Sequence, residues 1–291
     1  MKFSANLGFL WADQPLEEAV ASAAAAGFDA VEFHWPHETH PETPAETLNE
    51  VISANRITAL SVNTARGQVG GNAGRFGLCA IPGAEDEARS ALYEAMDYAA
   101  RLGATGIHAM AGITDDAAAG AVFERFLIEA APAAGERGLD LLIEPKNTHD
   151  VPGYFLTSPE QAADLIAASA SPSVRIPSVR IPSVRIPSVR IPSVRIPSVR
   201  MMYDCYHAGR MGRDIRADLT RFMPVIGHIQ IAAVPDRGEP DEGEVDYPAI
   251  LRHLEDLGYD GFIGAEYRPR QSTGDGLGWL EAFRKNIRKR I

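Results

Sequence analysis

Apolar and polar positions follow a repeating order along the chain: a short apolar run, a few polar residues, then an alanine- and leucine-rich stretch with helical spacing. The short apolar runs predict β-strands, since they are β-rich and bounded by glycine or polar residues. Glycine often stands where a helix ends and a left-handed residue is needed, as at Gly27 and Gly103. We expect helices at 15–26, 45–54, 85–102 and 159–168, and one ending before Gly138. We expect strands at 3–7, 30–33, 57–63, 106–110, 139–144, 199–203, 226–231 and 262–265.

Eight strand–helix units determine the expected fold class. Strands that alternate with helices imply a parallel sheet, and eight such units favour a closed barrel over an open doubly wound sheet. The length of 291 residues fits a barrel of ~250 residues without a second core. No GxGxxG motif follows the first strand, which weakens the dinucleotide-binding alternative. We therefore expect α/β architecture, with a single (β/α)8 TIM barrel over residues 1–291.

One segment departs from this order. From Ser173 the pentapeptide SVRIP runs five times without a substitution, and a sixth SVR ends at Arg200. Proline at every fifth position excludes an α-helix, and the odd period would turn a strand over at each copy. We interpret 173–197 as a repeat insertion in the connection before the sixth strand. It is either a tolerated duplication or an arginine-rich segment that docks on an acidic neighbouring subunit.

The composition narrows the functional class. The net charge of −11 argues against a nucleic-acid or anionic-membrane partner, because both would be repelled. No run approaches ~18 apolar residues, and the N-terminus lacks the basic and apolar regions of a signal peptide. The two cysteines, Cys79 and Cys205, show no CxxC spacing and suit a reducing compartment. We expect a cytoplasmic protein that acts on a small molecule.

Polar residues end most of the apolar runs, at the strand ends where barrels of this kind carry their active sites. Three of them, Glu144, Asp204 and Glu266, are carboxylates on neighbouring strand ends, and they would repel one another on the barrel axis unless a cation is present. Oxygen ligands from these carboxylates and one glutamine amide suit Mg²⁺ or Mn²⁺ better than Zn²⁺. The strand-end residues are Glu32 or His34, Asn63, His108, Glu144, Asp204, Gln230 and Glu266.

Four motifs carry a resemblance to a known family. They are IEPKNTHDVPGYF around Glu144, YDCYH around Asp204, HIQIAAVPDRGEPDEGEVDY around Gln230 and GFIGAEYRPR around Glu266. Together they resemble the hydroxypyruvate isomerase family, which belongs to the xylose isomerase-like barrels alongside the ketose 3-epimerases. GFDAVEFHWP and the stretch 63–82 fit the same family. The resemblance covers the chain apart from roughly 173–197.

The resemblance implies a role for each matching residue. Glu144 and Glu266 would be the acid/base pair and also metal ligands, with Asp204 and Gln230 completing the metal site. Gln230 stands where the related epimerases have a histidine ligand, which favours the isomerase branch. The residues expected to contact the substrate are His207, Arg237, His108, Arg66 and Lys146; Arg237, Arg66 and Lys146 are candidates for holding a substrate carboxylate.

The implied reaction is a metal-dependent isomerisation of hydroxypyruvate to tartronate semialdehyde, or of a related 2-oxo acid such as 2-oxo-tetronate, through an enediolate. The alternative is a ketose 3-epimerase acting on a neutral sugar, which needs no cation at the far end of the substrate. A metal-dependent phosphodiesterase acting on abasic DNA would need additional histidine ligands and a basic surface. By analogy with such barrels, a homodimer is the expected assembly.

Overall fold

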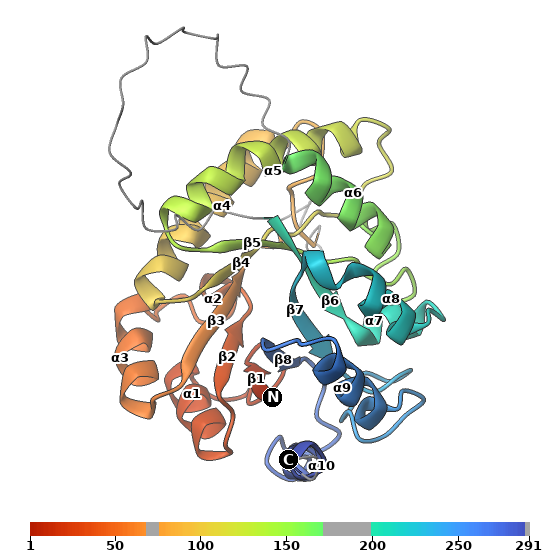
Figure 1. Cartoon of the computed structure of the whole chain (residues 1–291). Helices are drawn as coiled ribbons and strands as arrows, with labels where there is room; N and C mark the ends of the chain where they lie inside the picture. Colours follow the sequence, from red (N-terminus) through yellow and green to blue (C-terminus); the bar gives the residue numbers. More distant parts are fainter. Residues whose placement is uncertain (68–75, 171–198, 289–291) are drawn as a thin grey trace, which may run out of the picture.

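Eight parallel strands form a closed barrel in chain order, with β1 pairing with both β2 and β8 (Figure 1). This computed structural model describes residues 1–67, 76–170 and 199–288. The expected single (β/α)8 TIM barrel is confirmed. The strands are β1 (Lys2–Asn6), β2 (Ala30–Phe33), β3 (Thr58–Asn63), β4 (Gly106–His108), β5 (Asp140–Ile143), β6 (Val199–Asp204), β7 (Ile226–Ile231) and β8 (Phe262–Ala265).

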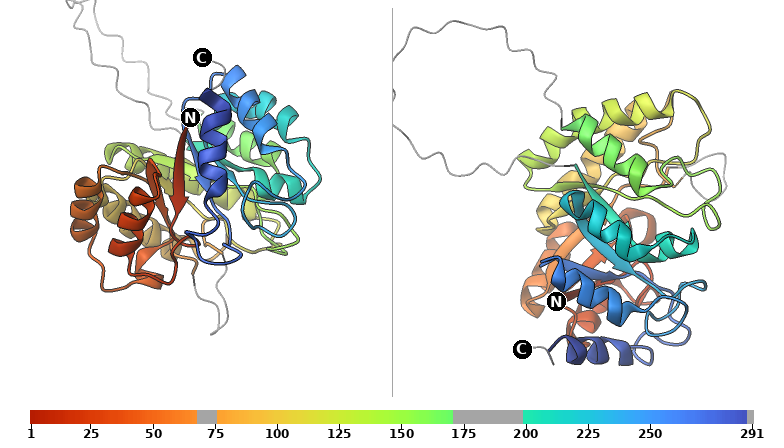
Figure 2. Two further views of the ribbon diagram at one scale, coloured as in Figure 1. Left: turned by 90° about the horizontal axis from the view of Figure 1, so that it is seen from below. Right: turned by 45° about the vertical axis from the view of Figure 1, so that its right-hand side comes forward.

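Helices between the strands surround the barrel (Figures 1 and 2). Within the described ranges, none of them has the length and apolar character needed to cross a bilayer. They are α1 (Leu16–Ala25), α2 (Pro36–Thr39), α3 (Ala45–Asn55), α4 (Glu85–Leu102), α5 (Ala119–Glu136), α6 (Pro159–Ser169), α7 (Cys205–Arg210), α8 (Ile215–Phe222), the 3-10 turn η1 (Met223–Val225), α9 (Tyr247–Asp256) and α10 (Gly278–Arg288).

Helix boundaries follow the local sequence in most places. Three acidic residues open α4, where they complement the helix dipole, and Gly103 closes it with a φ of 77°. Helix α3 also ends on a left-handed residue, but that residue is Arg56, with a φ of 54°. The expected strand at 106–110 ends at His108, because Met110 and Ala111 accept hydrogen bonds from the loop at 79–80 instead.

The C-terminal helix α10 covers the seam where the barrel closes. The ring of its fully buried Trp279 lies 5.7 Å from that of Phe3 on β1. Arg284 forms an ion pair of 2.6 Å with Asp29, just before β2. The first strand and the last helix therefore lie side by side (Figure 2).

The SVRIP array falls within residues 171–198, outside the described residues. Its place in the topology follows from its neighbours, since α6 ends at Ser169 and β6 begins at Val199 as expected. A helix-to-strand connection enters the barrel at the N-terminal edge of the strands, opposite the edge where the polar strand ends gather. The role of the array as an insertion in a single domain stays a prediction.

Candidate active site

The predicted strand-end residues gather at the C-terminal edge of the barrel. Asp204 ends β6 and Gln230 lies in β7, while Glu144 and Glu266 directly follow β5 and β8. All four side chains are buried, the most exposed being Glu266 at 6%. Parallel strands bring their carboxyl ends to one edge, so residues separated by more than 120 positions meet there.

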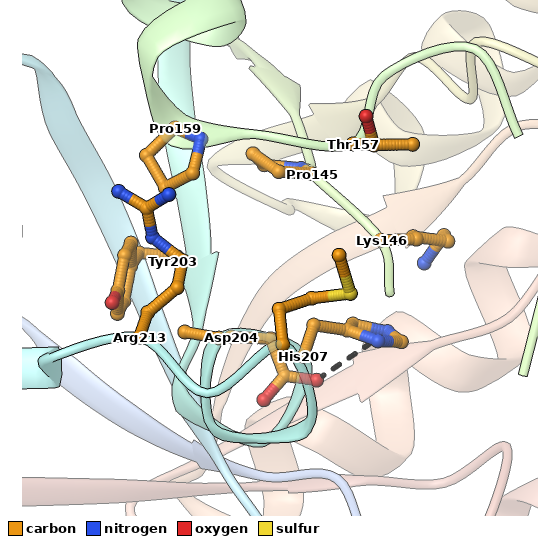
Figure 3. A pocket seen from close by; sticks show the side chains of 10 residues that line it. Pro145, Lys146, Thr157, Pro159, Tyr203, Asp204, His207 and Arg213 are labelled. Carbon is orange, nitrogen blue, oxygen red and sulfur yellow. Dashed lines mark ion pairs between the residues drawn. The ribbon is translucent and has the colours of Figure 1, made fainter. Parts of the chain in front are cut away.

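A cluster of three ligand-type side chains forms the centre of this edge. Ligand atoms of Glu144, Asp204 and His207 lie within 4.8 Å of one another. His207 Nε2 is 3.4 Å from a Glu144 oxygen and 3.7 Å from Asp204 Oδ2. Figure 3 shows Asp204 and His207 pointing toward each other beside a small cavity that Lys146 also lines. This arrangement makes a divalent metal site possible.

Two buried cations face the carboxylates. Lys146 pairs with Glu144 Oε2, which also lies 3.7 Å from His108 Nε2. The Arg237 guanidinium lies between the other two acids, 3.4 Å from Glu266 Oε1 and 3.7 Å from Asp204 Oδ2. With His207, the structure thus places four of the five predicted substrate-binding residues directly on the acid cluster.

Arg237 is held in a defined position. Its guanidinium carbon lies 4.9 Å from the ring centroids of both Phe9 and Tyr206. Its Nε donates to the Glu266 backbone oxygen at 3.4 Å, and its backbone adopts a φ of 61°. A planar cation between aromatic rings suits recognition of a carboxylate or similar anion.

The pKa values reflect an excess of negative charge. Burial, and then repulsion by Glu266, raise the pKa of Asp204 to about 8. Burial alone would raise the pKa of Glu266, but Arg237 and His34 lower it to about 2. Burial opposes ionisation of Glu144 too, yet Lys146 and His207 bring its pKa below the usual value. Two cations therefore do not fully compensate three carboxylates.

Unpartnered polar atoms test whether a cation fits here. Within the described part of the chain, four buried oxygens have no hydrogen-bond donor: Glu144 Oε1, Asp204 Oδ2, Gln230 Oε1 and Glu266 Oε2. Buried polar atoms without partners are rare in folded proteins and indicate a missing ion or ligand. These four oxygens are hard ligands, which fits Mg²⁺ or Mn²⁺, although the unpartnered Nε2 of His207 lies in the same group of ligand atoms.

His207 belongs to the geometric cluster, but its hydrogen bonds favour a different role from metal ligation. The Asn147 backbone N–H donates to its Nδ1 at 3.2 Å, and the Asn147 side-chain nitrogen lies 2.6 Å from the same atom. Burial lowers the pKa of His207 well below its usual value, so the ring is neutral and its proton is on Nε2. His207 is therefore a hydrogen-bond donor toward the site. Sequence reasoning missed Asn147, although it stands three residues after Glu144.

His108 lies directly against Glu144, whereas Arg66 contacts His34 rather than the acids themselves. Burial lowers the pKa of His108 to about 4, and its Nδ1 lies 3.1 Å from Asn63 Oδ1. The half-buried Arg66 places a guanidinium nitrogen 3.2 Å from His34 Nδ1, and His34 Nε2 lies 3.9 Å from Glu266 Oε1. Arg66 thus reaches the acids through His34, and its predicted contact with the substrate stays a prediction.

Comparison with known proteins identifies the family of the chain. A family model described as xylose isomerase-like TIM barrel matches residues 20–176 and 191–283. A 2-oxo-tetronate isomerase from Cupriavidus necator is 37% identical over 286 residues, covering 97% of this chain and 98% of that relative. A hydroxypyruvate isomerase from Escherichia coli is 31% identical over 288 residues, covering 98% and 100% respectively.

Solved structures share the fold. The crystal structure of an AP endonuclease, family 2, from Brucella melitensis has a TM-score of 0.81 at 32% identity, covering 97% of this chain and 98% of that one. A D-psicose 3-epimerase from Clostridium cellulolyticum H10 has a TM-score of 0.70 at 16% identity, covering 95% and 89%. The second likeness concerns the fold alone. The chain belongs to the xylose isomerase-like TIM barrels and, within them, to the hydroxypyruvate isomerase family of isomerases.

Proposed function

We propose that this isomerase interconverts a short 3-hydroxy-2-oxo acid and its 2-hydroxy-3-oxo isomer, with a divalent metal bound at the strand ends. Hydroxypyruvate and tartronate semialdehyde are the simplest such pair, and 2-oxo-tetronate contains the same reacting group with one more carbon. The relatives named for these two substrates support the proposal. The observation that carries it is a buried set of unpartnered oxygens flanked by the cations Lys146 and Arg237.

Glu144, Asp204, Gln230 and Glu266 would hold the metal through their oxygens, with Mg²⁺ or Mn²⁺ as the preferred ions. When bound, the cation polarises the substrate carbonyl and makes the neighbouring C–H more acidic. His207 keeps its proton on Nε2 and donates to an oxygen of the substrate, because Asn147 occupies its other ring nitrogen.

Glu144 and Glu266 are the proposed proton carriers. The neighbouring cations lower the pKa of both, so both are carboxylates at neutral pH and can accept a proton. One removes the proton from C3 to give an enediolate, and the other takes the proton that the C3 hydroxyl gives up and delivers it to C2. The first glutamate then returns its proton to the oxygen on C2. Across the whole reaction, C3 and its hydroxyl each lose a proton, while C2 and its oxygen each gain one, so the protons balance.

Arg237 and Lys146 distinguish the proposal from the ketose 3-epimerase alternative. A 2-oxo acid carries a carboxylate next to the reacting carbons, and a planar guanidinium held by two aromatic rings is suited to bind it. A neutral ketose has no group that needs such a partner. Cleavage of abasic DNA also fits less well, because the chain carries a net charge of −11.

The test is a substrate panel followed by NMR. Metal-loaded protein is incubated with hydroxypyruvate, 2-oxo-tetronate or D-fructose, and each mixture is repeated with excess chelator. We expect turnover of at least one 2-oxo acid, none of D-fructose, and loss of activity on chelation. Turnover of D-fructose alone would favour the epimerase, and full activity in chelator would exclude the metal-dependent mechanism.

A further inference from the structure

Beneath the proposed metal ligands lies a fully enclosed polar cluster that has no assigned role. Its centre is Glu32 on β2, a carboxylate only 1% exposed. Ser4 on β1 donates its hydroxyl to Glu32 Oε1 at 2.6 Å, and His228 Nε2 on β7 lies 3.1 Å from the same oxygen. Gln230 Nε2 donates to the other oxygen, Oε2, at 2.9 Å. Burying a carboxylate costs free energy that its two hydrogen bonds, from Ser4 and Gln230, only partly offset, which argues for a purpose beyond packing.

The chemistry of the Glu32–Gln230 contact decides how the glutamine amide lies. A carboxylate can only accept hydrogen bonds, whereas an amide donates through its nitrogen and accepts through its oxygen. Gln230 must therefore turn its nitrogen toward Glu32, which sends its Oε1 the other way. That oxygen is buried and has no hydrogen-bond donor among the described residues, like the oxygens of Glu144, Asp204 and Glu266.

The barrel backbone leaves room for this contact. Gly264 on β8 lies beside Gln230 on β7 and beside Ser4 on β1 in the strand register. A Cβ atom at Gly264 would lie 2.4 Å from Glu32 Oε1 and 2.9 Å from Gln230 Cγ. Any larger residue at position 264 would push the carboxylate and the glutamine from their positions.

We infer that Glu32 is a positioning residue that orients Gln230 so that its amide oxygen, rather than its amide nitrogen, faces the metal. An amide nitrogen cannot coordinate a hard cation, so an amide free to turn over would offer a ligand only part of the time. Groups that orient metal ligands typically change metal affinity 10–100-fold, by order of magnitude, when they are replaced. The inference rests on the proposed function, because it takes Gln230 as a metal ligand.

The experiment measures Mn²⁺ binding to metal-stripped protein by calorimetry, separately from activity. Glu32→Gln keeps the shape of the side chain but can donate as well as accept, so it no longer dictates the amide orientation. We expect Mn²⁺ to bind about 10–100-fold more weakly than to the wild type. Glu18→Gln, the same substitution at an exposed position, should leave Mn²⁺ affinity unchanged.

A swapped variant separates orientation from general damage. In Glu32→Gln/Gln230→Glu the amide donates to a carboxylate at 230, whose other oxygen then faces the metal, and Mn²⁺ affinity should return to at least the wild-type value. Wild-type affinity in Glu32→Gln would overturn the inference, as would a swapped variant that binds as weakly as the single one. If Glu32→Gln does not fold, the swapped variant alone decides by the same criterion. Failure of the wild type to bind Mn²⁺ would instead contradict the proposed metal site itself.

Discussion

Replacing Arg237 with leucine tests whether the site is built for a carboxylate substrate. Leucine is unbranched at Cβ like arginine, so it tolerates the positive φ of this position about as well, and it keeps apolar contact with Phe9 and Tyr206. The substitution removes a guanidinium that could donate two hydrogen bonds to the substrate carboxylate. At about 1.5–3 kcal/mol per charged hydrogen bond, the loss is about 3–6 kcal/mol. That range corresponds to a fall of about 10²–10⁴-fold in kcat/KM for hydroxypyruvate.

Arg237 also contacts Glu266 and Asp204, so activity on one substrate would not isolate the carboxylate contact. The assay therefore compares hydroxypyruvate with dihydroxyacetone, in which a CH₂OH group replaces the carboxylate, both followed by NMR. Wild-type protein should prefer hydroxypyruvate strongly, and Arg237→Leu should lose most of that preference. Arg268→Leu, at an exposed arginine 6.0 Å from the Phe9 ring, should keep it. An equal fall for both substrates in Arg237→Leu would refute carboxylate binding and leave Arg237 only a partner of the acids.

Three further predictions follow from the geometry. Glu144→Gln and Glu266→Gln should each lower turnover by at least ~10²-fold and stop solvent deuterium exchange into the substrate. Near wild-type turnover in either variant would show that the replaced glutamate carries no proton. Because the pKa of Asp204 is raised to about 8, Mn²⁺ must displace a proton from this carboxyl group below that pH. The Mn²⁺ affinity measured by calorimetry should therefore rise about tenfold per pH unit between pH 6 and 8 and then level off. A flat profile would argue against Asp204 as a ligand. Deleting residues 176–200 joins the first SVR to Met201 and should keep turnover within about threefold of the wild-type value. The reason is that this connection enters the barrel at the N-terminal edge of the strands, opposite the site. A folded but inactive deletion protein would contradict that placement.

Local patterns were sufficient to predict the fold. Short apolar runs, helical spacing and glycine at helix ends are all set within a few residues, and each of the eight expected strands is present. The departures occur where tertiary contacts take over. The strand at 106 ends early because Met110 and Ala111 bond to a neighbouring loop, and Arg56 adopts a left-handed conformation without being glycine.

The candidate site could be predicted only in part. Strand ends and motifs located Glu144, Asp204, Gln230 and Glu266, because the barrel topology itself brings these positions together. The contacts that orient them are not periodic: Glu32 and Gln230 are 198 residues apart. Sequence reasoning left Glu32 and His34 as alternatives, but the structure gives them separate positions, with Glu32 beneath Gln230 and His34 beside Glu266.

The central claim is that Glu144 and Glu266 move protons between C3 and C2 of a substrate whose C1 is a carboxylate. The most direct test is the proton NMR spectrum of hydroxypyruvate in D₂O with metal-loaded protein. The account predicts that tartronate semialdehyde appears, that deuterium enters the hydroxypyruvate C3 or product C2 position, and that neither occurs with Glu144→Gln or Glu266→Gln. Unchanged spectra for both hydroxypyruvate and 2-oxo-tetronate, while the same protein converts D-fructose to its C3 epimer, would contradict it.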